Sequence, residues 1–251
     1  MVRGHPEVAP GETLLRLDAV SKSYGSLRVT DGLSLAVSRG EALGIIGPNG
    51  AGKTTLMNLI AGDSVADAGR ITFCGQDVTT LSPAARCRAG IARSYQIPHP
   101  FVGLSVYENV LVGAMFGGGI GERAAQPVAL RVLQRTGLAS KANRVAGALP
   151  LLDRKRLEMA RALATRPTLL LLDEIAGGLT EHEVHELLAT IRSIREEGVT
   201  ILWIEHIVHA LTAIVGRLLA LDFGRRIAEG EPTAVMADPA VKEIYMGIDV
   251  E

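Results

Sequence analysis

Residues 43–60 read LGIIGPNGAGKTTLMNLI, and this stretch decides the fold. Within it, Gly47–Thr54 matches the phosphate-loop pattern G-x-x-x-x-G-K-[ST] at every position. An apolar run suited to a buried parallel strand, Ala42–Ile46, precedes the loop, and a helical segment, Thr54–Ile60, follows it. Because the motif requires this strand–loop–helix context, we predict that the chain binds a nucleoside triphosphate. The context disfavours the alternative of a glycine-rich turn without a ligand.

The residue types of the loop explain how it would hold phosphate. Glycines let the backbone turn tightly and point N–H groups at an anion, and the helix start adds unpaired amides and the positive end of its dipole. We expect Lys53 to reach the β- and γ-phosphates and the Thr54 hydroxyl to bind Mg²⁺. The predicted nucleotide-binding residues of the loop are Gly47, Pro48, Asn49, Gly50, Ala51, Gly52, Lys53, Thr54 and Thr55.

Composition argues against several other classes of protein. The 251 residues allow one large domain, or a domain with a lobe, and the net charge of −1 gives no strong field for nucleic acid. Cys74 and Cys87 are too few for a disulfide framework and lack zinc-site spacing. Residues 1–11 lack the apolar core of a signal peptide, and no run of about 18 apolar residues occurs, so we expect no membrane span.

Two acidic residues follow a second apolar strand. Thr168–Leu172 has four leucines in a row, which is typical of a strand buried on both faces, and it ends at Asp173 and Glu174. Ligands of open α/β sheets bind at the carboxyl ends of strands. We therefore expect Asp173 to contact Mg²⁺ and Glu174 to polarise the water that attacks the γ-phosphate. The alternative is a pair of acids that simply begins a loop.

Histidines occur at several positions of interest. His206 follows the predicted strand Val199–Ile204 after one residue, where it could hydrogen-bond the γ-phosphate and hold the attacking water, although a capping or core histidine is the open alternative. The pairs His182/His185 and His206/His209 have helical i,i+3 spacing. We do not expect a metal site there, because the first pair lies on a charged, solvated helix face with no cysteine nearby.

Two further positions have competing interpretations. Tyr24 follows the predicted strand Leu14–Val20, and its ring could stack on adenine or pack on the neighbouring strands. Gln96 ends the predicted strand Ile91–Tyr95, just before a loop stiffened by two prolines. Its amide suits contact with Mg²⁺ or with the attacking water, but without a family argument an ordinary loop is favoured.

The other elements complete the expected architecture. Leu14–Val20 and Ser34–Val37, with turns at Asp31-Gly32 and Arg39-Gly40, predict an antiparallel β patch. The glycine run 117–121 is interpreted as a flexible connection rather than a second phosphate site, because no strand precedes it. A further strand is predicted at 71–74. Helices are predicted at 83–89, 105–116, 122–136, 153–165, 181–197, 233–237 and 241–246, and a closing hairpin at 218–227.

With these pieces in this order, the chain resembles the ATP-binding subunits of ABC transporters over essentially its whole length. Within that superfamily it is most similar to the ATPases of branched-chain amino-acid importers, some motifs being shared with related importers of amides and urea. The resemblance rests on Gly44–Gly62 (GIIGPNGAGKTTLMNLIAG), Gly90–Gln96 (GIARSYQ), Leu104–Gly113 (LSVYENVLVG), Leu157–Leu163 (LEMARAL) and Asp238–Gly247 (DPAVKEIYMG).

The resemblance implies an α/β fold with a P-loop NTPase core of the ABC type. That core has a mixed sheet with flanking helices, an N-terminal antiparallel β patch and an inserted helical lobe. We expect a single ATP-binding domain over residues 1–251, with the core at 12–97 and 165–230, the helical lobe at 98–164 and C-terminal helices at 231–251.

The resemblance also implies residue roles. Tyr24 matches the adenine-stacking aromatic, Gln96 the Q-loop glutamine that binds Mg²⁺ and couples to the membrane subunit, and Asp173 the Walker B aspartate. Glu174 matches the catalytic base and His206 the switch histidine. The implied cofactors are ATP and Mg²⁺. The implied partners are a transmembrane permease, a second ATP-binding subunit in a head-to-tail dimer and, indirectly, a solute-binding protein, at the cytoplasmic face of the plasma membrane and without nucleic acid.

One motif departs from the family pattern. The family expects Leu-Ser-Gly-Gly-Gln, or a near variant that keeps the second glycine, but the matching residues here are Leu149, Pro150, Leu151, Leu152 and Asp153. Pro150 removes a hydroxyl and an N–H, and Leu152 replaces a glycine whose bare backbone must approach the γ-phosphate. Asp153 places a carboxylate where a neutral amide is expected, facing the phosphate charge. The next loop deviates too, with Ile175 for proline and Thr180 for Asn or Asp.

We therefore expect a degenerate signature loop. A homodimer would hydrolyse ATP slowly, whereas a sister ATPase with an intact signature would complete one good site on this chain. An engineered substitution or tolerated drift stays open as the origin of the departure. The alternative functions are a regulatory module that closes on nucleotide but barely hydrolyses it, and an ATPase of an exporter or lipid-extraction system.

Overall fold

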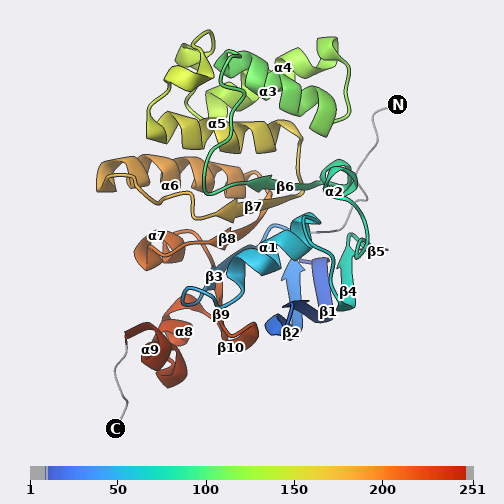
Figure 1. Cartoon of the computed structure of the whole chain (residues 1–251). Helices are drawn as coiled ribbons and strands as arrows, with labels where there is room; N and C mark the ends of the chain where they lie inside the picture. The colour runs from blue at the N-terminus through green and yellow to red at the C-terminus, as the bar shows by residue number, and fades with distance from the viewer. Residues whose placement is uncertain (1–8, 10, 247–251) are drawn as a thin grey trace.

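Two β-sheets organise the computed structural model, which describes residue 9 and residues 11–246 (Figure 1). The larger sheet has the strand order β10-β9-β3-β8-β7-β6, in which β10 pairs antiparallel at one edge and the other five strands pair in parallel. Its strands are β3 (Ala42–Ile46), β6 (Ile91–Ser94), β7 (Leu169–Asp173), β8 (Thr200–Ile204), β9 (Arg217–Asp222) and β10 (Arg225–Gly230). The predicted mixed sheet is confirmed.

The central strands of this sheet are buried on both faces. Along β7, Leu169 and Leu171 contribute to one hydrophobic cluster, while Leu170 and Leu172 contribute to the other. Successive side chains of a strand point to opposite faces, so each face needs its own apolar residues. This explains why β3, β7 and β8 are almost entirely apolar in sequence.

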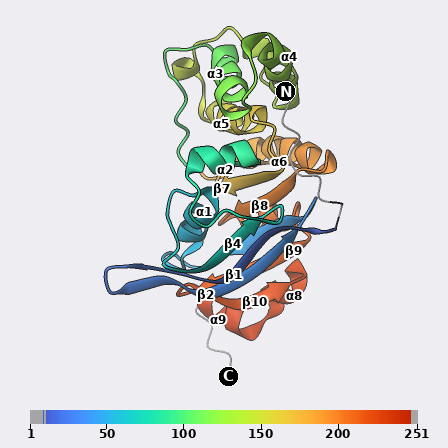
Figure 2. The ribbon, with the colours of Figure 1, turned by 90° about the vertical axis from the view of Figure 1, so that its right-hand side faces the viewer.

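The smaller sheet is the predicted antiparallel patch, and it pairs in the order β2-β1-β4-β5. Its strands are β1 (Thr13–Tyr24), β2 (Leu27–Ser38), β4 (Ala68–Phe73) and β5 (Gln76–Asp77). The turn predicted at Asp31-Gly32 is wrong, because β2 continues through it and the chain instead reverses at Gly25-Ser26. The β1–β2 pairing shifts register nearby, which accommodates the left-handed φ of +58° at Gly32. The end of this hairpin extends away from the body of the molecule (Figure 2).

Helices cover both faces of the larger sheet. The helix that follows the phosphate loop, α1, packs between the two sheets, and α3, α4 and α5 gather at the opposite end of the molecule from α8 and α9 (Figure 1). The helices are α1 (Lys53–Ala61), α2 (Pro83–Ala89), α3 (Val106–Val112), α4 (Glu122–Arg135), α5 (Leu151–Ala164), α6 (Glu181–Glu196), α7 (Val208–Thr212), α8 (Pro232–Ala237) and α9 (Pro239–Met246). The sequence did not predict α7, which is too short to show a helical period.

The glycine-rich segment between α3 and α4 is packed against α5. A π-helical turn, Gly113–Gly117, continues α3. A Cβ at Gly113 would meet the Arg161 carbonyl oxygen, and one at Gly117 would meet the Thr165 side chain. The interpretation as a flexible connection is therefore wrong for Gly117, because the missing side chain allows close approach to α5.

Residues 1–8, 10 and 247–251 lie outside the described part of the chain. The predictions for the extreme N-terminus and for the last residues of the C-terminal segment fall there. Among the described residues, no helix is both long enough and apolar enough to cross a membrane.

Candidate functional site

The phosphate loop connects β3 to α1. Beside it lies a cavity of about 170 Å³, which is lined by residues 49–55 of the loop and the start of α1, by Val29 and by Glu174. Gly52 caps α1 with a φ of +95°, a conformation that L side chains rarely adopt. A Cβ at Gly52 would also overlap the carbonyl oxygen of Val29. The glycine is thus required by both the backbone angle and the close approach of β2.

Lys53 is folded back onto its own loop. Its Nζ donates to the carbonyl oxygens of Gly47 at 2.6 Å and Pro48 at 2.9 Å. Burial lowers the pKa of the Lys53 ammonium, and the negative charges of Glu174 and Asp173 oppose that shift. The cation predicted to bind phosphate therefore lies close to both predicted acidic residues.

Glu174 is held between two polar side chains from different strand ends. Gln96 Nε2 donates to Glu174 Oε2 at 2.6 Å, and His206 Nε2 lies 2.8 Å from Glu174 Oε1. Because a carboxylate oxygen only accepts, His206 Nε2 carries the proton in this contact. The three residues predicted to act on the attacking water thus meet at one point, beside the phosphate-loop cavity that Glu174 lines.

Asp173 forms a buried ion pair that the sequence did not reveal. Its Oδ2 lies 2.6 Å from a guanidinium nitrogen of Arg93, and the two side chains are only 5% and 7% exposed. Arg93 also donates to Asn58 Oδ1 at 2.6 Å and to Asp63 Oδ2 at 2.9 Å. Arg93 therefore joins the end of β7 to the C-terminal end of α1.

The predicted Mg²⁺ ligands have the donor chemistry that this ion prefers. Thr54, Gln96 and Asp173 offer hydroxyl, amide and carboxylate oxygens, and Mg²⁺ takes oxygen ligands. Gln96 uses its nitrogen toward Glu174, and Arg93 takes only Oδ2 of Asp173. In the described part of the chain, the amide oxygen of Gln96 and Oδ1 of Asp173 accept no hydrogen bond, so these residues fit the ion. No cluster of three or more His, Cys, Asp or Glu able to hold a metal occurs among the described residues.

Tyr24 lies at the end of β1, and its side chain is directed to the turn after α1. Its hydroxyl lies 3.1 Å from Ser64 Oγ, Lys22 Nζ lies 5.5 Å from the ring centroid, and the residue is 49% exposed. It does not line the phosphate-loop cavity. An exposed ring face suits a stacking partner, and its role toward adenine stays a prediction.

Comparison with known proteins identifies the family of this fold and site. Residues 30–177 match the sequence profile described as ABC transporter, and residues 225–251 match that described as branched-chain amino acid ATP-binding cassette transporter. The chain belongs to the ABC transporter family. It is an ATPase subunit of the ATP-binding-cassette type, and the predicted resemblance is confirmed.

Relatives and solved structures cover nearly the whole cassette. The chain is 33% identical over 250 residues to the probable branched-chain amino acid transport ATP-binding protein LivG of Methanocaldococcus jannaschii, covering 93% of this chain and 97% of that one. It is 38% identical over 228 residues to the Nod factor export ATP-binding protein I of Paraburkholderia xenovorans, covering 90% and 73%. The ADP conformation of an ATP-binding cassette of an ABC transporter matches with a TM-score of 0.86 at 32% identity, covering 94% and 100%.

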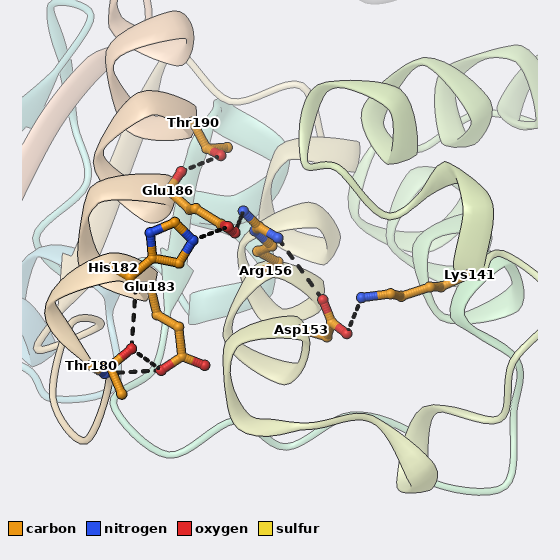
Figure 3. Close-up of polar contacts among 8 residues, drawn as sticks. All are labelled: Lys141, Asp153, Arg156, Thr180, His182, Glu183, Glu186 and Thr190. Carbon is orange, nitrogen blue, oxygen red and sulfur yellow. Dashed lines mark hydrogen bonds and ion pairs between the residues drawn. The ribbon is translucent and has the colours of Figure 1, made fainter.

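In this cassette Leu149, Leu152 and Asp153 of the signature loop are buried, whereas Pro150 and Leu151 are exposed. Leu149 and Leu152 belong to the core, and α5 begins at Leu151 with Pro150 as its cap, which offers no side-chain hydrogen bond. Asp153 was predicted to face phosphate, but it is only 2% exposed and lies 2.5 Å from Lys141 Nζ (Figure 3). The expected repulsion of phosphate by Asp153 is therefore not seen in this conformation.

The contacts of Asp153 continue to the core helix α6 (Figure 3). Its Oδ1 lies 4.0 Å from Arg156, and Arg156 lies 2.8 Å from Glu186 on α6. His182 contacts the other oxygen of Glu186 at 3.2 Å. Thr180, which departs from the family pattern, forms a capping box with Glu183 at the start of α6. The altered positions thus make stabilising contacts of their own.

Two residues of the site region escaped the sequence analysis. Arg93 is a charged residue within a short apolar strand, and a buried arginine implies an acidic partner, but the sequence does not say which one. Glu205 directly precedes His206 and is buried, which a strand-end position alone does not reveal.

Replacing Gly52 by alanine tests the conformation of the loop. The left-handed φ and the overlap with Val29 predict about 1–3 kcal/mol of strain, so we expect ATP affinity to fall about tenfold or more. Titration with a fluorescent ATP analogue measures the affinity. Gly121→Ala is the control, because Gly121 has a φ of −66° and open space around it. Equal affinities of the two variants would contradict the prediction.

Removing the cation from the Arg93–Asp173 pair tests its burial. Arg93→Met leaves Asp173 without its partner, and we expect a loss of about 3–5 kcal/mol in the free energy of unfolding. The matched control is Arg16→Met, because Arg16 pairs with Asp18 on the surface, where loss of a pair costs about 0–1 kcal/mol. Urea unfolding followed by circular dichroism compares the two. A loss as small as that of the control would show that the pair is not buried in solution.

Proposed function

We propose that this chain is the ATP-hydrolysing, energy-coupling subunit of an importer for branched-chain amino acids or similar small polar solutes. The observation that carries the proposal is that Gln96 and His206 both contact the carboxylate of Glu174 beside the phosphate loop. The match of residues 225–251 to the branched-chain amino acid profile supports the substrate class. An ATPase of an exporter is the second candidate, favoured by the identity to the Nod factor export protein.

In the proposed mechanism, water attacks the γ-phosphate in line with the leaving oxygen. Glu174 accepts the proton of that water, while His206 and Gln96 orient its carboxylate. Lys53 exchanges the carbonyl oxygens of Gly47 and Pro48 for phosphate oxygens, which neutralises developing charge. Mg²⁺ held by Thr54, Gln96 and Asp173 would supply further charge neutralisation when bound.

The altered signature loop determines which subunit can complete the site. Each ATP in a head-to-tail dimer lies between one subunit's phosphate loop and the other's signature loop. Here that loop offers Pro150, an exposed Leu151 and a buried Leu152 in place of the hydroxyl and the two glycines, and losing one oriented donor typically costs about 10²–10³ in rate. We propose that a sister ATPase with an intact signature closes over Lys53.

We further propose that the permease docks in a groove beside the site, which places the chain at the membrane surface. A cavity of about 360 Å³ lies between the core and the helices of the proposed lobe at 98–164. Its walls carry exposed aromatic rings, with Arg93 over Tyr95 and Arg161 over Phe101, each 4.8 Å from the ring centroid. Because Gln96 directly follows Tyr95, a segment bound here would sense the state of Glu174.

Hydrolysis by the isolated chain tests the need for a partner. We expect turnover at least about 100-fold slower than in the complex purified from membranes, because self-pairing leaves both sites with the altered signature. Glu174→Gln in the complex should abolish the remaining phosphate release while ATP still binds. Robust, concentration-dependent turnover of the isolated chain would contradict the partner requirement. Single-turnover hydrolysis near zero in the complex would instead favour the regulatory alternative.

A charged substitution in the groove tests the docking surface. Phe116 lines the groove and is 73% exposed, so Phe116→Asp should not unfold the chain but should abolish co-purification with the permease. Leu130→Asp on α4 is the control, because Leu130 is 52% exposed and does not line the groove. Equal recovery of permease with both variants would place the docking surface elsewhere.

A further inference from the structure

A buried glutamate joins the two loops that carry the predicted catalytic groups. Glu205, between β8 and His206, is only 1% exposed. Its Oε2 accepts the backbone N–H of Ala176 at 3.0 Å, and its Oε1 accepts the backbone N–H of His206 at 3.0 Å. One carboxylate therefore binds the segment that follows Glu174 and the segment that carries the histidine.

The segment after β7 needs such a contact. Glu174 has a φ of +46°, a left-handed conformation that is strained for a residue with a side chain. Such a conformation persists only where the surrounding structure holds it. The backbone N–H of Glu174 donates to Ile204 at 2.9 Å, and Ala176, two residues later, donates to Glu205. Both anchors of this turn thus come from the end of β8.

Burial of Glu205 disfavours the charged form of its carboxyl. Burial raises the pKa of its carboxyl above the ordinary value, although the backbone N–H donors oppose the shift. Lys155 is buried on α5 two residues after the altered signature; burial lowers the pKa of its ammonium, and the negative charges of Glu205 and Glu174 oppose that shift. Glu205 does not line the phosphate-loop cavity. A buried carboxyl that does not line the ligand cavity is explained by what it holds in place.

We propose that Glu205 is a positioning residue that fixes the Glu174 turn and His206 relative to each other, and this inference rests on the proposed hydrolytic function. It acts through backbone hydrogen bonds and does not touch ATP. Because both of its oxygens accept, any movement of the loop at Ala176 is passed to the backbone of His206. The residue thereby keeps the predicted base and its histidine aligned while the cassette opens and closes.

Glu205→Gln is the test, because it keeps the shape but replaces one accepting oxygen with an NH₂ group. One of the two N–H groups then loses its acceptor. A small misplacement of reacting groups can cost about 100-fold in rate, so we expect kcat of the membrane-purified complex to fall about 10- to 100-fold. KM for ATP should stay unchanged, because no contact with nucleotide is lost.

Thermal unfolding separates positioning from a general structural role. The pKa of Glu205 is raised on folding, so its charged form costs stability at pH values above the ordinary glutamate pKa. Glutamine removes that cost at neutral pH, which offsets the loss of one acceptor for a buried N–H, so we expect Tm to change little. The matched control is Glu231→Gln. The carboxylate of Glu231 also accepts a backbone N–H, from Ala234 at 3.1 Å, and we expect kcat of this variant to equal that of the wild type.

Hydrogen exchange of the Ala176 and His206 amides tests the contact without any need for hydrolysis. Glu205→Gln should speed exchange at one or both, and unchanged protection would overturn the inference. A parallel fall of kcat, ATP affinity and Tm would also overturn it, because that indicates general damage. If kcat is unchanged while Glu174→Gln is inactive, the inference alone fails. A wild-type complex that does not hydrolyse, or a Glu174→Gln complex that does, indicates instead that the proposed function has failed.

Discussion

The parallel alignment of β6, β7, β8 and β3 is the constraint on which the site depends. Ser94 pairs with Leu172, Asp173 with Ile204, and Ile45 also with Ile204, so these strands end at the same edge of the sheet. The phosphate loop, Gln96, Glu174 and His206 each follow one of these ends within two residues. Burial of the strands on both faces holds the register, since a shift by one residue would exchange the two apolar faces. The site geometry is therefore a consequence of core packing.

In this conformation the charged groups of the site have hydrogen-bond or ion-pair partners within the protein. Lys53 binds carbonyl oxygens of its own loop, Asp173 binds Arg93, and Glu174 is held by Gln96 and His206. Unpaired charges at such depth would be costly, so the pairs stabilise the site before nucleotide arrives. A triphosphate must compete with these contacts, and binding is thereby coupled to rearrangement of the side chains that are proposed to carry out hydrolysis.

Local patterns predicted most strands, most helices and the strand-end positions of the candidate residues. They did not predict contacts between distant segments, such as Arg93 with Asp173 or Glu205 with Ala176, because a single sequence does not specify which buried charge meets which partner. The predicted orientation of Asp153, toward phosphate, was wrong for a local reason. Helix α5 begins at Leu151 rather than Asp153, which places Asp153 in the first turn, on the same side as Arg156 three residues later.

The contacts around the altered signature connect it to the rest of the cassette. Asp153 is buried against Lys141, Leu149 and Leu152 pack in the core, and Arg156 joins α5 to α6 through Glu186, while Leu151 stays 40% exposed. These contacts need no nucleotide, so they tie the helical segment to the core in the ATP-free protein. The loop therefore keeps packed contacts with the rest of the cassette, although Pro150 and Leu152 do not offer the hydroxyl and the bare backbone of the family pattern.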